Sequence, residues 1–181
     1  MFLYDKIIVV DFEATCWEDK EYQKENSEII EIGICKYVIS TGEIEDKRSY
    51  YIKPEKSEIG KYCTDLTGIT QDKIDSEGVT LDIALKRISK KYSPQVRIWA
   101  GFGENDRSML ENDCYKKGII NPFSVTYWDI KALLLVKDKI DNTIGLKKEI
   151  ERVGEIFEGL NHSAADDAYN AAKLLRYIFY K

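Results

Sequence analysis

The chain has 181 residues, a size typical of one domain, and 44% of them are apolar, which is ample for a single hydrophobic core. No stretch approaches the roughly 20 apolar residues that a membrane span needs, and the first residues do not resemble a signal peptide, so we expect one domain over residues 1–181, located in the cytoplasm. The net charge of −5 argues against a protein held on nucleic acid by bulk positive charge, but it allows an enzyme whose acids are neutralised by divalent ions.

The first half of the chain predicts three strands in an antiparallel meander. Residues 6–12 are apolar on both faces, as in a buried strand, and a charged loop over residues 17–28 follows them. The isoleucine-rich residues 29–38 predict a second strand. After a turn signal, the alternating residues 44–53 predict the third strand.

The second half alternates between helices and strands. Residues 81–92 carry apolar side chains among lysines, which predicts a surface helix. The other expected elements are strands over 96–100 and 124–128, and helices over 105–117, 129–136, 145–153 and 163–179. Three antiparallel strands followed by strand–helix alternation predict an α/β protein with a mixed five-stranded sheet flanked by helices, in a ribonuclease-H-like fold.

The first candidate site residues stand at the end of the first strand. Asp11 and Glu13 are two positions apart, so both side chains point to the same face of the strand. Two carboxylates at the end of a core strand repel each other and are poorly solvated unless cations lie between them. Taken alone, the pair has a structural alternative, in which Asp11 merely ends the strand and Glu13 is solvated.

A third acid, Asp106, falls in the first turn of the helix predicted over 105–117. Leu110 and Cys114 follow it at four-residue steps, so the three side chains share the face that should meet the sheet. Glu104 competes with Asp106, but it belongs to the loop before the helix. The alternative is an acid that only complements the helix dipole.

The only histidine of the chain, His162, precedes the last helix. Ser163 and Asp166 fit a capping box, with Ser163 as N-cap and Asp166 three residues into the helix. Asp167 is then free to face the sheet, and His162 lies just outside the helix, where it is suited to proton transfer. The alternative is a surface histidine ahead of a well-capped helix.

Four acids on three elements and one histidine predict a hydrolytic metal site more strongly together than singly. Carboxylate oxygens suit Mg²⁺ or Mn²⁺, which keep open positions for phosphate and water. Two such ions about 3.5–4 Å apart can clamp a phosphodiester. An imidazole can accept the proton of the attacking water near neutral pH, so no protein nucleophile is required.

Three ordered segments also carry a family resemblance: Asp11-Phe-Glu13-Ala-Thr-Cys-Trp17, Gly103-Glu-Asn-Asp106 and His162-Ser-Ala-Ala-Asp-Asp167. They resemble the three motifs of the DEDDh 3′–5′ exonucleases, and the chain is most similar to the Eri1-like and KapD-like branch of RNA-directed enzymes. Supporting segments are Glu28-Ile-Ile-Glu31-Ile-Gly33, Cys63-Thr-Asp-Leu66-Thr67-Gly68-Ile69-Thr70, and Gly145-Leu146 leading to Phe157-Glu-Gly-Leu160. The resemblance extends from about residue 6 to residue 179.

This resemblance implies that two Mg²⁺ or Mn²⁺ ions are bound by Asp11, Glu13, Asp106 and Asp167, with His162 as general base. The implied reaction releases nucleoside 5′-monophosphates from the 3′ end of single strands or 3′ overhangs, with RNA favoured over DNA. Two alternatives stay open, a DNA-directed exonuclease such as a proofreading subunit and a catalytically weak nucleic-acid-binding module. The sequence does not indicate an oligomeric state, and a monomer is a reasonable expectation.

The same resemblance implies where the nucleotides bind. The backbone around Ala14 and Thr15 would meet the 3′-terminal nucleotide, and the pocket for the last bases would be lined by Trp17, Leu66, Thr67 and Ile69. Apolar and aromatic surfaces stack on any base, as stepwise degradation requires. Trp17 is equally compatible with a core position. The chain departs from the branch at Phe102 and Asn105, where tryptophan and an aromatic residue are common, and this puts contacts to the second nucleotide in doubt.

Two further groups of residues are expected to be structural. The cysteines Cys16, Cys35, Cys63 and Cys114 form no C-x-x-C pair, so we expect reduced and mostly packed thiols. The densest basic cluster is expected to be a solvated helix face and comprises Lys86, Arg87, Lys90 and Lys91.

Overall fold

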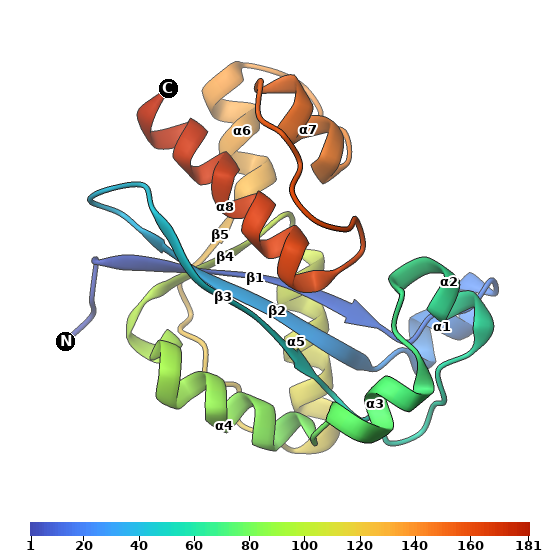
Figure 1. Ribbon diagram of the computed structural model, residues 1–181. Helices are drawn as coiled ribbons and strands as arrows, with labels where there is room; N and C mark the ends of the chain where they lie inside the picture. Colours follow the sequence, from blue (N-terminus) through green and yellow to red (C-terminus); the bar gives the residue numbers. More distant parts are fainter.

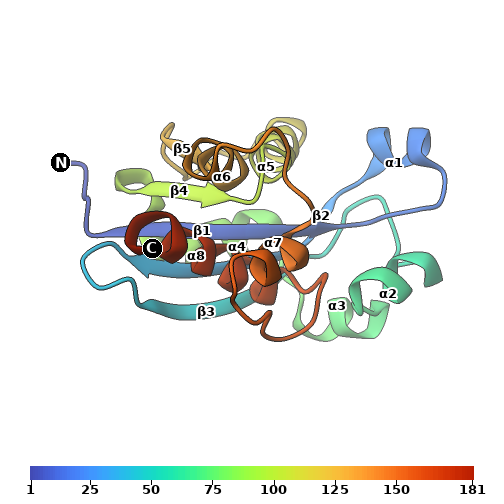
Figure 2. The same cartoon turned by 90° about the horizontal axis from the view of Figure 1, so that it is seen from above.

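The computed structural model describes residues 1–181 as a mixed five-stranded sheet with helices on both faces (Figures 1 and 2). The strands are β1 (Lys6–Ala14), β2 (Ile29–Val38), β3 (Ile44–Tyr51), β4 (Ile98–Gly101) and β5 (Tyr127–Asp129). Their order in the sheet is β3-β2-β1-β4-β5. β2 is antiparallel to both β1 and β3, whereas β4 and β5 run parallel to β1. The predicted ribonuclease-H-like sheet is therefore confirmed.

The helices are α1 (Lys20–Asn26), α2 (Lys61–Thr67), α3 (Gln71–Glu77), α4 (Leu81–Tyr92), α5 (Asn105–Lys117), α6 (Ile130–Asp138), α7 (Leu146–Arg152) and α8 (Ala164–Tyr180). Three of them, α1, α2 and α3, were not predicted from the sequence. The expectation of a plain loop over 17–28 was wrong, because Asp19 accepts hydrogen bonds from two backbone N–H groups and begins α1 there. Helices α1, α2 and α3 have seven residues each, too few for a clear hydrophobic period.

Alternate residues of β1 separate two layers of core. Ile8 and Val10 pack on the face covered by α4 and α5, while Ile7 and Val9 pack on the face covered by α6, α7 and α8. Figure 1 shows these two groups of helices on opposite sides of the sheet. The period-2 alternation of a strand carries Asp11 and Glu13 onto the second face, the one that α8 covers.

The first residues of α8 lie almost in contact with the backbone of β2. Gly33 makes this possible, because a Cβ at this position would lie 1.9 Å from the carbonyl carbon of Ala164 and 2.0 Å from its oxygen. Gly33 is also the pairing partner of Asp11 across the sheet. The helix therefore begins directly above the strand that carries the first acid.

All four cysteines are buried and none forms a disulfide, as predicted. None of the helices combines the length and the apolar character that crossing a bilayer would require.

Gly33→Ala should destabilise the protein, because the new methyl group would overlap the backbone of Ala164. Overpacking of this kind costs roughly 1–3 kcal/mol, and occasionally more, in free energy of unfolding. Urea denaturation measures this loss. Gly60→Ala is the matched control, since a Cβ at Gly60 meets nothing within 4 Å. Equal stability of the two variants would contradict the close approach of α8 to β2.

Candidate active site

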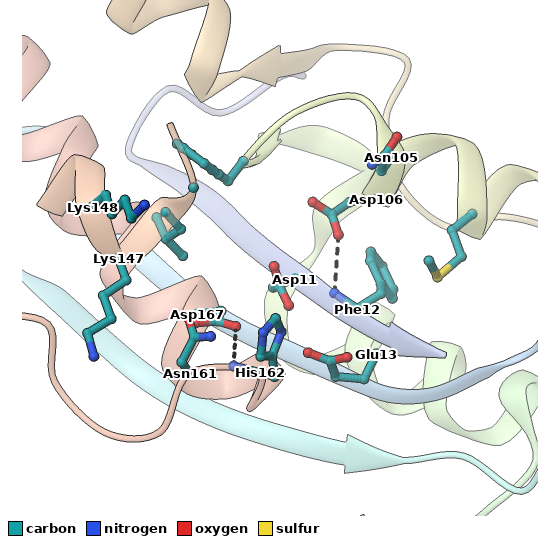
Figure 3. Close-up of a pocket in the computed structure, with 14 residues that line it drawn as sticks. Asp11, Phe12, Glu13, Asn105, Asp106, Lys147, Lys148, Asn161, His162 and Asp167 are labelled. Carbon is teal, nitrogen blue, oxygen red and sulfur yellow. Dashed lines mark hydrogen bonds between the residues drawn. The ribbon is translucent and has the colours of Figure 1, made fainter. Parts of the chain in front are cut away.

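A cavity of about 640 Å³ opens at the end of β1 (Figure 3). Five of its lining residues are those predicted to carry the chemistry: Asp11, Glu13, Asp106, His162 and Asp167. They come from β1, α5, the loop before α8 and the first turn of α8. Phe102 and Asn105, where the sequence departs from the Eri1-like pattern, line the same cavity.

Asp106 reaches β1 because β4 is shorter than β1. The pairing of β4 with β1 ends at Val9 opposite Ala100, which leaves the next part of β1 without a strand partner on that side. The backbone N–H of Phe12 donates a hydrogen bond to Asp106 Oδ1 at 3.2 Å instead. Gly101 leaves room for this carboxylate, since a Cβ there would lie 2.7 Å from Asp106 Oδ2. The burial of Asp106 against the sheet, predicted from its helix face, is confirmed.

The start of α8 differs from the predicted capping box. Ser163 is the N-cap residue, but its side chain makes no capping hydrogen bond. Asp166 Oδ2 instead accepts a hydrogen bond from the N–H of Leu160 at 2.7 Å, and Asp167 Oδ2 accepts one from the N–H of His162 at 3.0 Å. The capping box was wrong because the preceding loop folds back over the helix start and takes both carboxylates. Asp167 still faces the sheet and is buried, as predicted.

Glu31 is a buried acid next to the site whose structural role was not predicted from the sequence. It is 1% exposed and pairs with Glu13 across the sheet. Its Oε2 accepts a hydrogen bond from the N–H of Ala164 at 3.2 Å, and its Oε1 accepts one from Ser49 Oγ at 2.5 Å. Glu31 thus supplies from β2 the cap that Ser163 does not provide. The only signal in the sequence is an acid inside the isoleucine-rich run of β2.

His162 stands at the rim of the cavity in an uncommon backbone conformation. Its φ angle of 66° lies in the left-handed region, which costs a residue with a Cβ roughly 1–2 kcal/mol. The hydrogen bond from its N–H to Asp167 holds it there. His162 is exposed, whereas the four carboxylates are buried or half-buried. The side chain is therefore accessible to solvent while it lines the cavity.

The two acids of β1 are poorly stabilised as anions. Burial raises the pKa of Asp11 well above its usual range, and the charges of Asp106 and Asp167 raise it further. Burial, with the charges of Asp167 and Glu31, raises the pKa of Glu13 to about 8. Neutral carboxylic acids are thus favoured at this strand end unless positive charge enters the cavity.

The acids of the two helices show the same effect to a smaller extent. Burial raises the pKa of Asp106 to about 7, although the hydrogen bond from the Phe12 N–H acts against it. Burial also raises the pKa of Asp167 to about 6, against the hydrogen bond from the His162 N–H. The backbone donors therefore compensate only part of the cost of burying these charges.

The donor set fits divalent cations. Asp167 Oδ1 is buried and has no hydrogen-bond partner, and such an orphaned oxygen is costly unless another ligand satisfies it. Ligand atoms of Glu13, His162 and Asp167 lie within 4.8 Å of one another. Oxygen-rich carboxylate sites of this kind match the preferences of Mg²⁺ and Mn²⁺.

The residues predicted to contact nucleotides lie outside this cavity. The Thr15 N–H donates to Glu28 O, and the Glu28 N–H donates to Thr15 Oγ1, each at 2.9 Å. Ile69 is 3% exposed and packs in a small core cluster, while Thr67 Oγ1 bonds to Cys63 O. Trp17, Leu66 and Ala14 keep accessible surface. The nucleotide contacts assigned to these residues stay predictions. Only Ala14, Trp17 and Leu66 have accessible surface that a nucleotide could contact.

Known proteins are similar to this chain in sequence and in fold. A mouse protein, ERI1 exoribonuclease 2, is 34% identical over 95% of this chain, although the chain spans only 28% of that protein's length. The 3′-5′ exonuclease Snipper of Drosophila melanogaster is 31% identical, with 95% of this chain and 68% of that protein covered.

A solved structure agrees with these relatives. The nuclease domain of 3′hExo, described as a DEDDh family member bound to rAMP, superposes with a TM-score of 0.87 at 28% identity. The superposition covers 98% of this chain and 94% of that one. The family model described as Exonuclease (RNase_T) matches residues 8–175. A match over nearly the whole chain, with the five motif residues in one cavity, shows that this protein belongs to the exonuclease family.

Proposed function

We propose that this chain is a metal-dependent 3′–5′ exonuclease that removes nucleoside 5′-monophosphates from single strands or 3′ overhangs, with RNA preferred to DNA. The observation that carries the proposal is the meeting of four buried or half-buried carboxylates and one exposed imidazole in a single cavity. The names of the relatives, exoribonuclease and 3′-5′ exonuclease, support the direction and the substrate. The rAMP bound to a neighbouring structure supports a ribonucleotide product.

The carboxylates and the histidine have separate roles in this proposal. Two Mg²⁺ or Mn²⁺ ions are held by Asp11, Glu13, Asp106 and Asp167. When bound, such ions lower the pKa of water and neutralise charge on the leaving oxygen. His162 accepts the proton of the attacking water, because its ring is exposed at the rim and within reach of the cavity. Asp167 serves twice, since its Oδ2 fixes the His162 backbone while its Oδ1 is free for an ion.

The terminal bases bind, in this proposal, where the chain leaves β1. Leu66 is 41% exposed on α2, and Trp17 packs edge-on against Tyr22 with ring centroids 5.0 Å apart. Lys20 of α1 lies over the ring of Tyr62 of α2, which joins the two helices at this end of the sheet. An apolar surface of this kind binds bases by stacking and without sequence preference.

Degradation should proceed from the 3′ end and require the metal site. With Mn²⁺ present, a 5′-labelled oligoribonucleotide should shorten in single steps, while a 3′-labelled one should release only the labelled mononucleotide. Asp11→Asn should abolish both products, because one metal-binding carboxylate is lost. Gel analysis with matched RNA and DNA strands also measures the sugar preference. A 3′ end that stays intact, with wild type and Asp11→Asn indistinguishable, would disprove the proposal.

Metal binding and turnover should separate in two variants. His162→Ala should bind metal as wild type does but lose about 10²–10⁴-fold in kcat, the usual contribution of a general base. Asp167→Asn should lose both, because it removes an ionised ligand while keeping the size of the side chain. Calorimetric titration with Mn²⁺, together with single-turnover kinetics, gives the two quantities. The role assignment fails if both variants bind the metal with equal affinity.

The metal-free protein should lose stability as the pH rises. The pKa values of Asp167, Asp106 and Glu13 are raised to about 6, 7 and 8, so their neutral forms favour the folded state. This stability is complete below the unfolded-state pKa values near 4 and is lost as pH passes through the raised values.

Urea denaturation with a chelator should therefore give a falling free energy of unfolding between about pH 5 and pH 8.5. Saturating Mn²⁺ should reduce the fall, since the ions bind the ionised carboxylates of the folded state. Glu13→Gln should also flatten the curve, because its side chain does not titrate. A metal-free stability that is constant over this range, or that rises, would contradict the burial of the acids.

A further inference from the structure

Two lysines line the cavity of carboxylates without pairing with any of them. Lys147 and Lys148 lie in the first turn of α7, and both side chains are exposed. Neither takes part in an ion pair of the structure. In Figure 3 they occupy the α7 side of the pocket, apart from the acids. They are therefore free cations beside a site that must accept a polyanion.

No other cationic side chain lines this cavity. The nearest rival, Lys131, places its ammonium 4.9 Å from the ring centroid of Phe102 and is not part of the lining. Bound divalent ions would balance the carboxylates and the scissile phosphate. The next phosphate along the strand has no such partner, and each phosphate left without a cation costs affinity.

The position of the lysines indicates which phosphate they meet. Glu13 and the end of β1 lie on one side of the pocket, and Lys147 and Lys148 lie on the other (Figure 3). A strand whose last nucleotide lies beyond Glu13 must leave the cavity on the opposite side. We propose that Lys147 and Lys148 bind the phosphates immediately upstream of the scissile bond and so favour oligonucleotides over mononucleotide esters. This inference rests on the proposed exonuclease function.

The test compares two substrates that differ in their upstream part. A pentaribonucleotide carries upstream phosphates, whereas the p-nitrophenyl ester of a nucleoside 5′-monophosphate has only the scissile phosphodiester. The variants are Lys147→Ala with Lys148→Ala, and the same pair changed to arginine. Arg87→Ala with Lys90→Ala is the control, because these exposed cations lie on α4, away from the cavity.

The alanine pair should lower kcat/KM for the pentaribonucleotide far more than for the ester. The slope of log(kcat/KM) against log salt should flatten by about 1.4 for the pentaribonucleotide, at about 0.7 for each lost contact to a single strand. The arginine pair should keep the slope, because the charge remains, and the α4 control should match wild type. Equal losses on both substrates, or an unchanged slope, would overturn the inference.

A binding measurement keeps this inference separate from the proposed function. Fluorescence anisotropy with a 5′-labelled pentaribonucleotide, in a His162→Ala background with Mn²⁺, gives the salt slope of the affinity without turnover. A wild-type protein that hydrolyses neither substrate would refute the exonuclease proposal. The anisotropy slope would then still decide whether the two lysines bind phosphate, since an alanine pair with an unchanged slope excludes them.

Discussion

The close contact between the start of α8 and the backbone of β2 is the constraint on which the site depends. Gly33 has no side chain, so Ala164 can lie directly on the strand. Because Gly33 pairs with Asp11, the first turn of α8 is brought beside the first acid of β1. Asp167 is thereby buried next to Asp11, and it accepts a hydrogen bond from the backbone N–H of His162, which holds that backbone beside the helix start. One missing Cβ thus brings the carboxylate cluster together with His162, the proposed general base.

In this arrangement, the stability of the metal-free fold and the binding of cations make opposite demands on the acids. Burying four acids in one cavity favours their neutral forms, which cannot bind cations well. The fold compensates locally with single donors, the Phe12 N–H for Asp106 and the His162 N–H for Asp167. It leaves Asp167 Oδ1 unsatisfied. Unsatisfied groups of this kind persist where a ligand completes them, so the stored cost is consistent with a site that is finished only by metal ions.

Local patterns were enough to predict the sheet and the acidic set, because period-2 alternation orients Asp11 and Glu13 and helical period orients Asp106. The features that were missed depend on contacts between distant segments. Glu31 of β2 caps α8 by accepting a hydrogen bond from Ala164, and these two residues are 133 positions apart in the sequence. The capping box failed for a local reason, since backbone N–H groups of the loop before α8 donate to the carboxylates of Asp166 and Asp167. Short helices such as α2 were not predicted, because seven residues show little hydrophobic periodicity.

The distribution of charge is compatible with an acidic protein that acts on nucleic acid, as proposed. A net charge of −5 gives no long-range attraction for nucleic acid, so affinity must come from a few cations placed at the site. In the proposed function, divalent ions held by the carboxylates would convert the most negative part of the cavity into the part that binds the scissile phosphate. Lys147 and Lys148, which line the cavity, would extend that attraction to the adjacent phosphates if they bind the strand as proposed. Attraction for a strand would then be confined to the phosphates near the cavity, because the net charge of the chain supplies none at a distance.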